Sequence, residues 1–325
     1  MQDELLKAPF PYFGGKSQIA KIIWQALGQP KHYIEPFFGS GAVLLARPDY
    51  EQSMCETIND KDGFIANVWR AIKFAPDEVA QWCDWPVNHV DLNARRKILI
   101  ANEKNLLKNL TDDAEWFDAK LAGYWIWAAS CWIGSGLTKG TGNQIPHLDG
   151  RGKGIHTIGK IPHISERGRN INNLSNQNVY ERITELSIRL RRVRVVCGEW
   201  NRVCGGNWQN RLGTVGIFFD SPYAVTNRHT SLYHHDSTTV ANDVLTWAKA
   251  RGQLSDYRIV IAGYDEHEEL LKDKWTSVNW KANGGYANQA NKQGIKNKGR
   301  ETLYFSPHCL PIKKQEELNF FNEAL

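Results

Sequence analysis

A carboxylate and an aromatic ring flank a stiff turn in the second half of the chain. The hydrophobic run VGIFF at residues 215–219 has strand character and leads directly into Asp220, Ser221, Pro222 and Tyr223. Such a turn at the end of a strand lies where the loops of an α/β sheet bind their ligands. A single D-S-P-Y also occurs as an ordinary surface turn, so the motif needs support from elsewhere in the chain.

A glycine-rich turn near the N-terminus gives that support. The strand-like run HYIEPF at residues 32–37 leads into a Gly-Ser-Gly turn at 39–41, and a helical run follows. Glycine lets the backbone come close to a ligand. The turn is not a dinucleotide fingerprint, because Leu44 stands where a third glycine is needed. The earlier PYFGGKS segment is not a Walker loop, because Phe10 replaces its first glycine. A further strand-like run ends on Asp60, between the two turns.

Strands and helices alternate at both ends of the chain and not in the middle. The patterns predict strands at residues 32–37, 56–60, 193–198, 215–220, 257–263 and 301–306. They predict helices at 64–72, 76–85, 94–107, 117–132, 180–193, 239–254 and 266–275, with Asp77 and Asp112 or Asp113 capping helix starts. We expect an α/β domain made of residues 1–65 and 180–325. Residues 66–179 would form an inserted, mainly helical and basic module.

Charge is concentrated in the middle of the chain. The whole chain carries +5, but residues 139–211 hold thirteen basic side chains against five acidic ones. Residues 281–300 add five basic side chains and no acid. Basic stretches rich in glycine and asparagine favour a surface that binds a polyanion, although a solvated charged face gives the same pattern.

Composition excludes several other classes of protein. No apolar run approaches the ~20 residues that span a bilayer, and the N-terminus lacks the apolar segment of a signal peptide. The six cysteines form no C-x-x-C pair, which leaves a zinc ribbon, a redox motif or a disulfide framework without support. We therefore expect a cytoplasmic protein with no metal site and no obligatory protein partner.

Taken together and in this order, the motifs resemble the Dam-like class of DNA adenine-N6 methyltransferases. YFGGK at residues 12–16 resembles their aromatic-x-G-G-K opening, and EPFFGSG at 35–41 their loop for S-adenosylmethionine. Asn59-Asp60 matches the acidic position after their second strand, CGEW at 197–200 a later acidic-aromatic pair, and DSPY at 220–223 their D-P-P-Y. The resemblance covers about residues 8–62 and 180–306. It implies a Rossmann-like methyltransferase sheet, S-adenosylmethionine as cofactor, duplex DNA as partner, and a bacterial or phage-infected host cell.

The resemblance also implies roles for individual residues. The cofactor-binding set would be Tyr12, Phe13, Lys16, Glu35, Phe37, Gly39, Ser40, Gly41, Asp60, Glu199, Trp200 and Asp220. Within it, Asp60 would accept from the ribose hydroxyls and Glu199 from the adenine amine. The catalytic set would be Asp220, Ser221, Pro222 and Tyr223, with Tyr223 stacking on a flipped-out base. The DNA-binding set would be Lys139, Arg151, Lys153, Arg167, Arg169, Lys292 and Lys296.

Two departures from the family pattern affect specificity. Ser221 replaces the commonest proline, and the inserted module lacks the N-G-x-x-R and F-N-x-P-x-G patterns of Dam enzymes, so GATC recognition is not carried over. Methylation of cytosine N4 is one alternative, although an aspartate at position 220 favours adenine. A catalytically silent nucleic-acid-binding protein of the same fold is the other.

Overall fold

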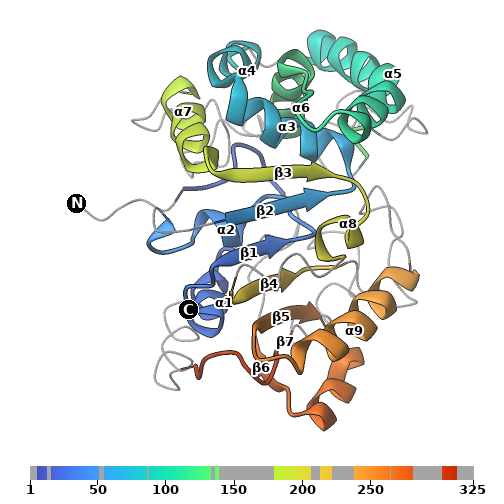
Figure 1. Ribbon diagram of the computed structural model, residues 1–325. Helices are drawn as coiled ribbons and strands as arrows, with labels where there is room; N and C mark the ends of the chain where they lie inside the picture. The colour runs from blue at the N-terminus through green and yellow to red at the C-terminus, as the bar shows by residue number, and fades with distance from the viewer. Residues whose placement is uncertain are drawn as a thin grey trace.

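A seven-stranded sheet forms the centre of the molecule, in the order β3-β2-β1-β4-β5-β7-β6 (Figure 1). The computed structural model describes residues 6–12, 16–50, 55–85, 88–132, 136–138, 179–205, 213–221, 238–263, 265–280 and 302–312. The strands are β1 (His32–Glu35), β2 (Cys55–Asp60), β3 (Val193–Cys197), β4 (Val215–Phe219), β5 (Tyr257–Gly263), β6 (Thr276–Asn279) and β7 (Thr302–Phe305).

The strand order creates a ligand crevice between β1 and β4. Strands β3, β2, β1, β4 and β5 pair in parallel, whereas β7 pairs antiparallel with both β5 and β6. From β1 the chain moves outward to β2 and β3 and then returns to β4 on the other side of β1. Ligands of open parallel sheets bind at such a reversal, beyond the carboxyl ends of the strands. Both sequence motifs, at 35–41 and at 220–223, follow these two strands.

Alternating side chains of the strands pack into two separate cores. Phe218 of β4 and Val260 of β5 belong to one apolar cluster, and their neighbours Ile217 and Ile259 belong to the other. Successive residues of a strand point to opposite faces, so the two clusters cover the two faces of the sheet. Every residue of β1 and β4 is buried, as expected for central strands covered on both sides.

The helices are distributed over both faces. They are α1 (Ala20–Leu27), α2 (Ala42–Leu45), α3 (Gly63–Phe74), α4 (Pro76–Cys83), α5 (His89–Asp112), α6 (Ala119–Cys131), α7 (Val179–Leu190), α8 (Asn201–Cys204) and α9 (Thr238–Gly252), with the 3-10 helix η3 (Asp265–Asp273). Figure 1 shows α3 to α7 gathered beside β3 and β2, and α8, α9 and η3 on the other side of the sheet. No helix in the part of the chain that the structure describes is long and apolar enough to cross a membrane.

The structure confirms the predicted elements with some differences, and helices α1 and α8 were not predicted. The expected helix caps were wrong: Asp77 lies inside the first turn of α4, and Asp112 and Asp113 lie at the end of α5. The side chains that cap are Asp62, Asn88 and Asp118, which accept from backbone N–H groups of α3, α5 and α6. The segment at 266–275 is a 3-10 helix, and β6 was not predicted because it is an exposed, polar edge strand.

The expected boundaries of the inserted module fall within helices. Residues 65 and 66 both lie in α3, and residues 179 and 180 begin α7. Helix α3 packs on β2 and β3, and its apolar residues share one cluster with β4 and β5. Since residues 139–178 lie outside the described residues, the division into two domains stays a prediction.

Candidate active site

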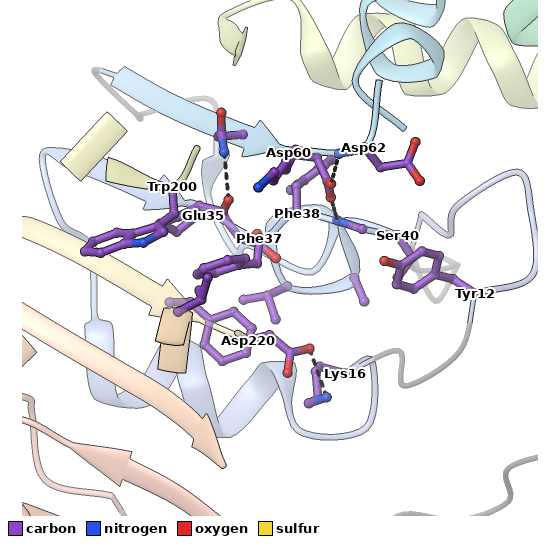
Figure 2. Close-up of a pocket in the computed structure, with 18 of the residues that line it drawn as sticks. Tyr12, Lys16, Glu35, Phe37, Phe38, Ser40, Asp60, Asp62, Trp200 and Asp220 are labelled. Atoms are coloured by element: carbon purple, nitrogen blue, oxygen red, sulfur yellow. Dashed lines mark hydrogen bonds and ion pairs between the residues drawn. The ribbon is translucent and has the colours of Figure 1, made fainter. Parts of the chain in front are cut away.

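A pocket opens at the carboxyl ends of β1, β2, β3 and β4. Figure 2 shows Phe37, Phe38, Tyr12 and Trp200 around it, together with several acidic side chains. The lining residues are Tyr12, Lys16, Glu35, Pro36, Phe37, Phe38, Gly39, Ser40, Ala42, Val43, Asn59, Asp60, Lys61, Asp62, Gly198, Glu199, Trp200, Phe218, Asp220 and Val240.

The turn between β1 and α2 requires glycine at two positions. Gly39 and Gly41 have φ angles of 50° and 65°, which side chains other than glycine rarely adopt. A Cβ atom on Gly39 would lie 2.6 Å from the ring of Tyr12, and one on Gly41 would overlap the ring of Phe38. The G-S-G pattern therefore lets two aromatic side chains close over the turn.

Asp60 holds this turn to the end of β2. Its carboxylate accepts hydrogen bonds from the backbone N–H groups of Gly39 at 2.8 Å and Asp62 at 2.9 Å. Burial, and then the charge of Asp62, raise the pKa of Asp60 to about 7. Asp60 is thus a fixed support of the loop, and each of its oxygens already accepts one hydrogen bond.

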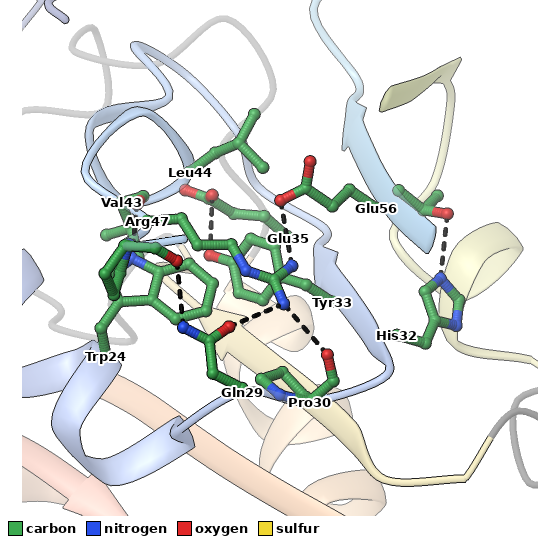
Figure 3. A network of polar contacts seen from close by, with 12 residues as sticks. Trp24, Gln29, Pro30, His32, Tyr33, Glu35, Val43, Leu44, Arg47 and Glu56 are labelled. Carbon is green, nitrogen blue, oxygen red and sulfur yellow. Dashed lines mark hydrogen bonds and ion pairs between the residues drawn. The ribbon is translucent and has the colours of Figure 1, made fainter. Parts of the chain in front are cut away.

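A polar network that includes Arg47 and Glu56 supports α2 (Figure 3). Glu56 accepts from Arg47 at 3.0 Å and from both terminal nitrogens of Arg189, at 2.7 and 2.9 Å. Arg189 also donates to the carbonyl of Leu44, and Trp24 donates to that of Val43, at 2.9 and 2.7 Å. Because α2 has only four residues, these bonds to its carbonyls determine where it lies.

Glu35 lies at the base of the pocket and is almost fully buried. The Tyr33 hydroxyl donates to its carboxylate at 2.8 Å. Burial raises the pKa of Glu35 well above its ordinary value, and the nearby charge of Asp220 acts in the same direction. The protonated form of Glu35 is therefore favoured, which suits a support of the pocket better than a fixed negative charge.

Lys16 and Asp220 form an ion pair at 2.9 Å at the open side of the pocket (Figure 2). Lys16 is buried, whereas the side chain of Asp220 is 25% exposed. The pair joins the first motif of the chain to the last strand-end motif. Lys16 of the G-G-K segment thus holds in place Asp220, the carboxylate of the D-S-P-Y turn.

The far wall of the pocket comes from the loop after β3. Trp200 packs edge to face against Phe219 and lines the pocket. Glu199 is half exposed. It forms an ion pair with Lys61, which links the loops that follow β3 and β2. An aromatic wall next to an accessible carboxylate can bind a flat ring that carries an amino group.

The predicted cofactor residues come together in this pocket. Ten of them line it: Tyr12, Lys16, Glu35, Phe37, Gly39, Ser40, Asp60, Glu199, Trp200 and Asp220. Gly41 is in the same turn but does not line the pocket, and Ser221 is buried beside Asp220. Phe13, Pro222, Tyr223 and the whole predicted DNA-binding set (Lys139, Arg151, Lys153, Arg167, Arg169, Lys292 and Lys296) lie outside the described residues.

Several lining residues were not predicted from the sequence. Asn59, Lys61 and Asp62 flank Asp60, and their closeness to a predicted residue was the available signal. Val240, in α9, reaches the pocket from a helix that carries no motif, so only the fold brings it there.

A comparison with protein families agrees with this geometry. Residues 12–115 match the family model of the D12 class N6 adenine-specific DNA methyltransferases. The match confirms the resemblance to Dam-like enzymes. With the sheet, it confirms the Rossmann-like methyltransferase fold and the predicted activity, methylation of adenine N6 in DNA. It favours adenine over cytosine N4 as the target. Among curated proteins, none matches the chain.

Proposed function

We propose that this chain transfers a methyl group from S-adenosylmethionine to the N6 amine of an adenine that is flipped out of duplex DNA. The observation that carries the proposal is the convergence of two distant motifs: Asp220 is paired with Lys16 at the edge of the pocket that the 35–41 loop encloses. The loop proposed to bind the cofactor thus lies next to an accessible carboxylate that can receive a target amine.

The chemistry of the pocket fits S-adenosylmethionine. Glu199 and Trp200 would hold the adenine ring, Glu199 by accepting from the exocyclic amine. Asp60 keeps lone pairs that would accept from the ribose hydroxyls while it holds Gly39. The turn at 39–41 and Tyr12 would cover the methionine end. When bound, the cofactor supplies an electrophilic methyl group on sulfur.

Asp220 and Ser221 would then prepare the target nitrogen. The lone pair of an adenine amine is delocalised into the ring, which makes the amine a poor nucleophile. Acceptors for both N–H groups favour a pyramidal nitrogen, and Asp220 would offer its carboxylate and Ser221 its backbone carbonyl. Electrostatic preorganisation of this kind is worth several kcal/mol. In the transfer, the C–S bond to the methyl group breaks as the N6–C bond forms, S-adenosylhomocysteine leaves, and N6 loses one proton to solvent. An in-line arrangement of nitrogen, methyl and sulfur favours this step.

Lys16 would hold Asp220 in place until the base arrives. The lysine is buried and lies 2.9 Å from the carboxylate, so it restrains the position of this side chain. A base inside a duplex is out of reach of such a pocket, so the target adenine must leave the stack, and Tyr223 is the residue expected to stack on it.

A labelling assay tests the proposal. The purified chain is incubated with duplex DNA and cofactor labelled in the methyl group, and the DNA is digested to nucleosides. We expect label in N6-methyladenine and none after substitution Asp220→Ala. Label in N4-methylcytosine would change the target, and no label with intact DNA binding would favour the silent binding protein.

A further inference from the structure

The side chain of Asn59 joins the two loops that form opposite walls of the pocket. Its amide nitrogen donates to the carbonyl of Pro36 at 3.0 Å and to that of Gly198 at 2.9 Å. The residue is 1% exposed. One buried side chain thus connects the loop after β1 with the loop after β3.

Backbone hydrogen bonds at the end of β2 reinforce this connection. The N–H of Phe38 donates to the carbonyl of Asn59 at 3.0 Å, and the N–H of Gly198 donates to that of Asp60 at 3.1 Å. Strand β2 lies between β1 and β3, so its last residues can reach both loops. The side chain of Asn59 is the component of this connection that a substitution can remove.

Only an amide satisfies these contacts. Both partners of the Asn59 nitrogen are carbonyl oxygens, so the NH2 group must face them, and this determines the orientation of the amide. A carboxylate of the same shape has no donor and would repel both carbonyls. A serine would offer one donor in place of two.

We propose that Asn59 is a positioning residue of the cofactor pocket. Its side chain sets the spacing between the 36–41 loop and the loop that carries Glu199 and Trp200. The inference rests on the proposed function, since it assigns a cofactor to that pocket. Asn59 acts through the loops, because its donors are fully used by Pro36 and Gly198. Its loss should therefore weaken cofactor binding without removing a group that acts on the target base.

The experiment measures the affinity for S-adenosylhomocysteine by calorimetry in Asn59→Asp and Asn59→Leu. We expect the Kd to rise about 10- to 100-fold in both, because small displacements of positioning groups have effects of this size. The leucine variant adds no charge beside Asp60, so an effect common to both is due to the lost donors. The KM for cofactor should rise in parallel, while kcat at saturating cofactor and the Kd for DNA change less than about 3-fold.

Asn67→Asp is a matched control. Asn67 lies in α3, is fully buried, donates to the carbonyl of Asp118 and accepts from its N–H, both at 2.8 Å. It does not line the pocket. This control should lower the unfolding temperature and leave the Kd for S-adenosylhomocysteine within about 2-fold.

The outcomes separate the two proposals. Asn59 variants that lose stability but bind S-adenosylhomocysteine as the wild type does would overturn the positioning role alone. A wild-type chain that binds no S-adenosylhomocysteine would refute the proposed cofactor and this inference together. If Asn59→Asp does not fold, Asn59→Ser keeps one donor and should give an intermediate Kd; a wild-type Kd there and in Asn59→Leu would again contradict the inference.

Discussion

The carboxyl edge of the sheet and the helical layer beside β3 both bury charged groups, but they use them differently. At the edge, carboxylates hold loops around an open pocket: Asp60 binds Gly39, and Asp220 pairs with Lys16. In the helical layer, guanidinium groups bind carbonyls and aromatic rings. Arg70 donates to four backbone carbonyls, and Arg95 lies 4.3 Å from the ring centre of Tyr124.

The difference indicates which measurements should respond to changes in each region. The pKa of Asp60 is raised by burial and by Asp62, and the residue lines the pocket. Arg70 and Arg95 of the helical layer do not line this pocket, and they donate to carbonyls at the ends of α5 and α4. Substitutions at the edge should alter binding and turnover, whereas those in the helical layer should alter the free energy of unfolding.

The largest effect is expected at Asp220. Asp220→Ala should lower methyl transfer at least ~100-fold, because a well-placed transition-state acceptor is lost. The fold should stay intact, since this side chain is partly exposed at the end of β4. Single-turnover kinetics on duplex DNA measure the loss, with circular dichroism as the control. Near-normal turnover in a folded variant would contradict the mechanism.

Arg70 offers the opposite test within the helical layer. Arg70→Met should lower the free energy of unfolding by about 2–4 kcal/mol, because it removes the donor to buried carbonyls of α5 and β3 and to part-buried carbonyls of the α5–α6 connection. Denaturant titration measures this change. The Kd for S-adenosylhomocysteine of the folded variant should match the wild type, and a large increase would remove the distinction between the two regions.

Asp60→Ala should weaken cofactor binding by about 1.5–3 kcal/mol, as for the loss of a charged hydrogen bond. The matched control is Asp118→Ala, which removes the carboxylate that caps α6 and does not line the pocket. Calorimetry should detect weaker binding in the first variant only. Equal affinities in Asp60→Ala and the wild type would assign the ribose contact to another residue.

Cofactor affinity should also depend on pH near neutrality. The pKa of Asp60 is raised above its ordinary value to about 7, so this group stabilises the fold at low pH and that contribution is lost as pH rises through about 7. Ribose hydroxyls would bind the ionised form, so the Kd for S-adenosylhomocysteine should fall up to about 10-fold from pH 6 to pH 8. Asp60→Asn should flatten this profile; an unchanged profile would assign the titration to another group.

The smallest effect concerns the basic stretch beyond the described residues. Replacing Arg151 and Lys153 with alanine should lower DNA affinity and reduce the salt dependence by a slope of about 0.9 for each lost phosphate contact. Filter binding at several salt concentrations measures both quantities, and the affinity for cofactor should not change. An unchanged slope would identify the stretch as a solvated face. Methylation mapped only to GATC would contradict the expectation of different specificity.

Local sequence patterns predicted the elements well and their ends less well. The apolar run of β4 is unmistakable because both faces of this strand are buried. Strand β6 has three exposed residues among four, so its sequence resembles a loop and only its pairing with β7 makes it a strand. Asp112 resembles a helix cap by type, but the helix before it continues through that residue.

The sequence by itself determined the chemistry of this protein. The order of the motifs, the two glycines with positive φ and the aspartate after β4 specify a pocket and an acceptor, because each depends on residues close together in the chain. The tertiary structure alone decided which side chains meet. Three contacts join segments far apart in the chain. Lys16 pairs with Asp220, Asp60 accepts a hydrogen bond from Gly39, and Asn59 donates to both loops. Such contacts depend on strand order, which local periodicity does not encode.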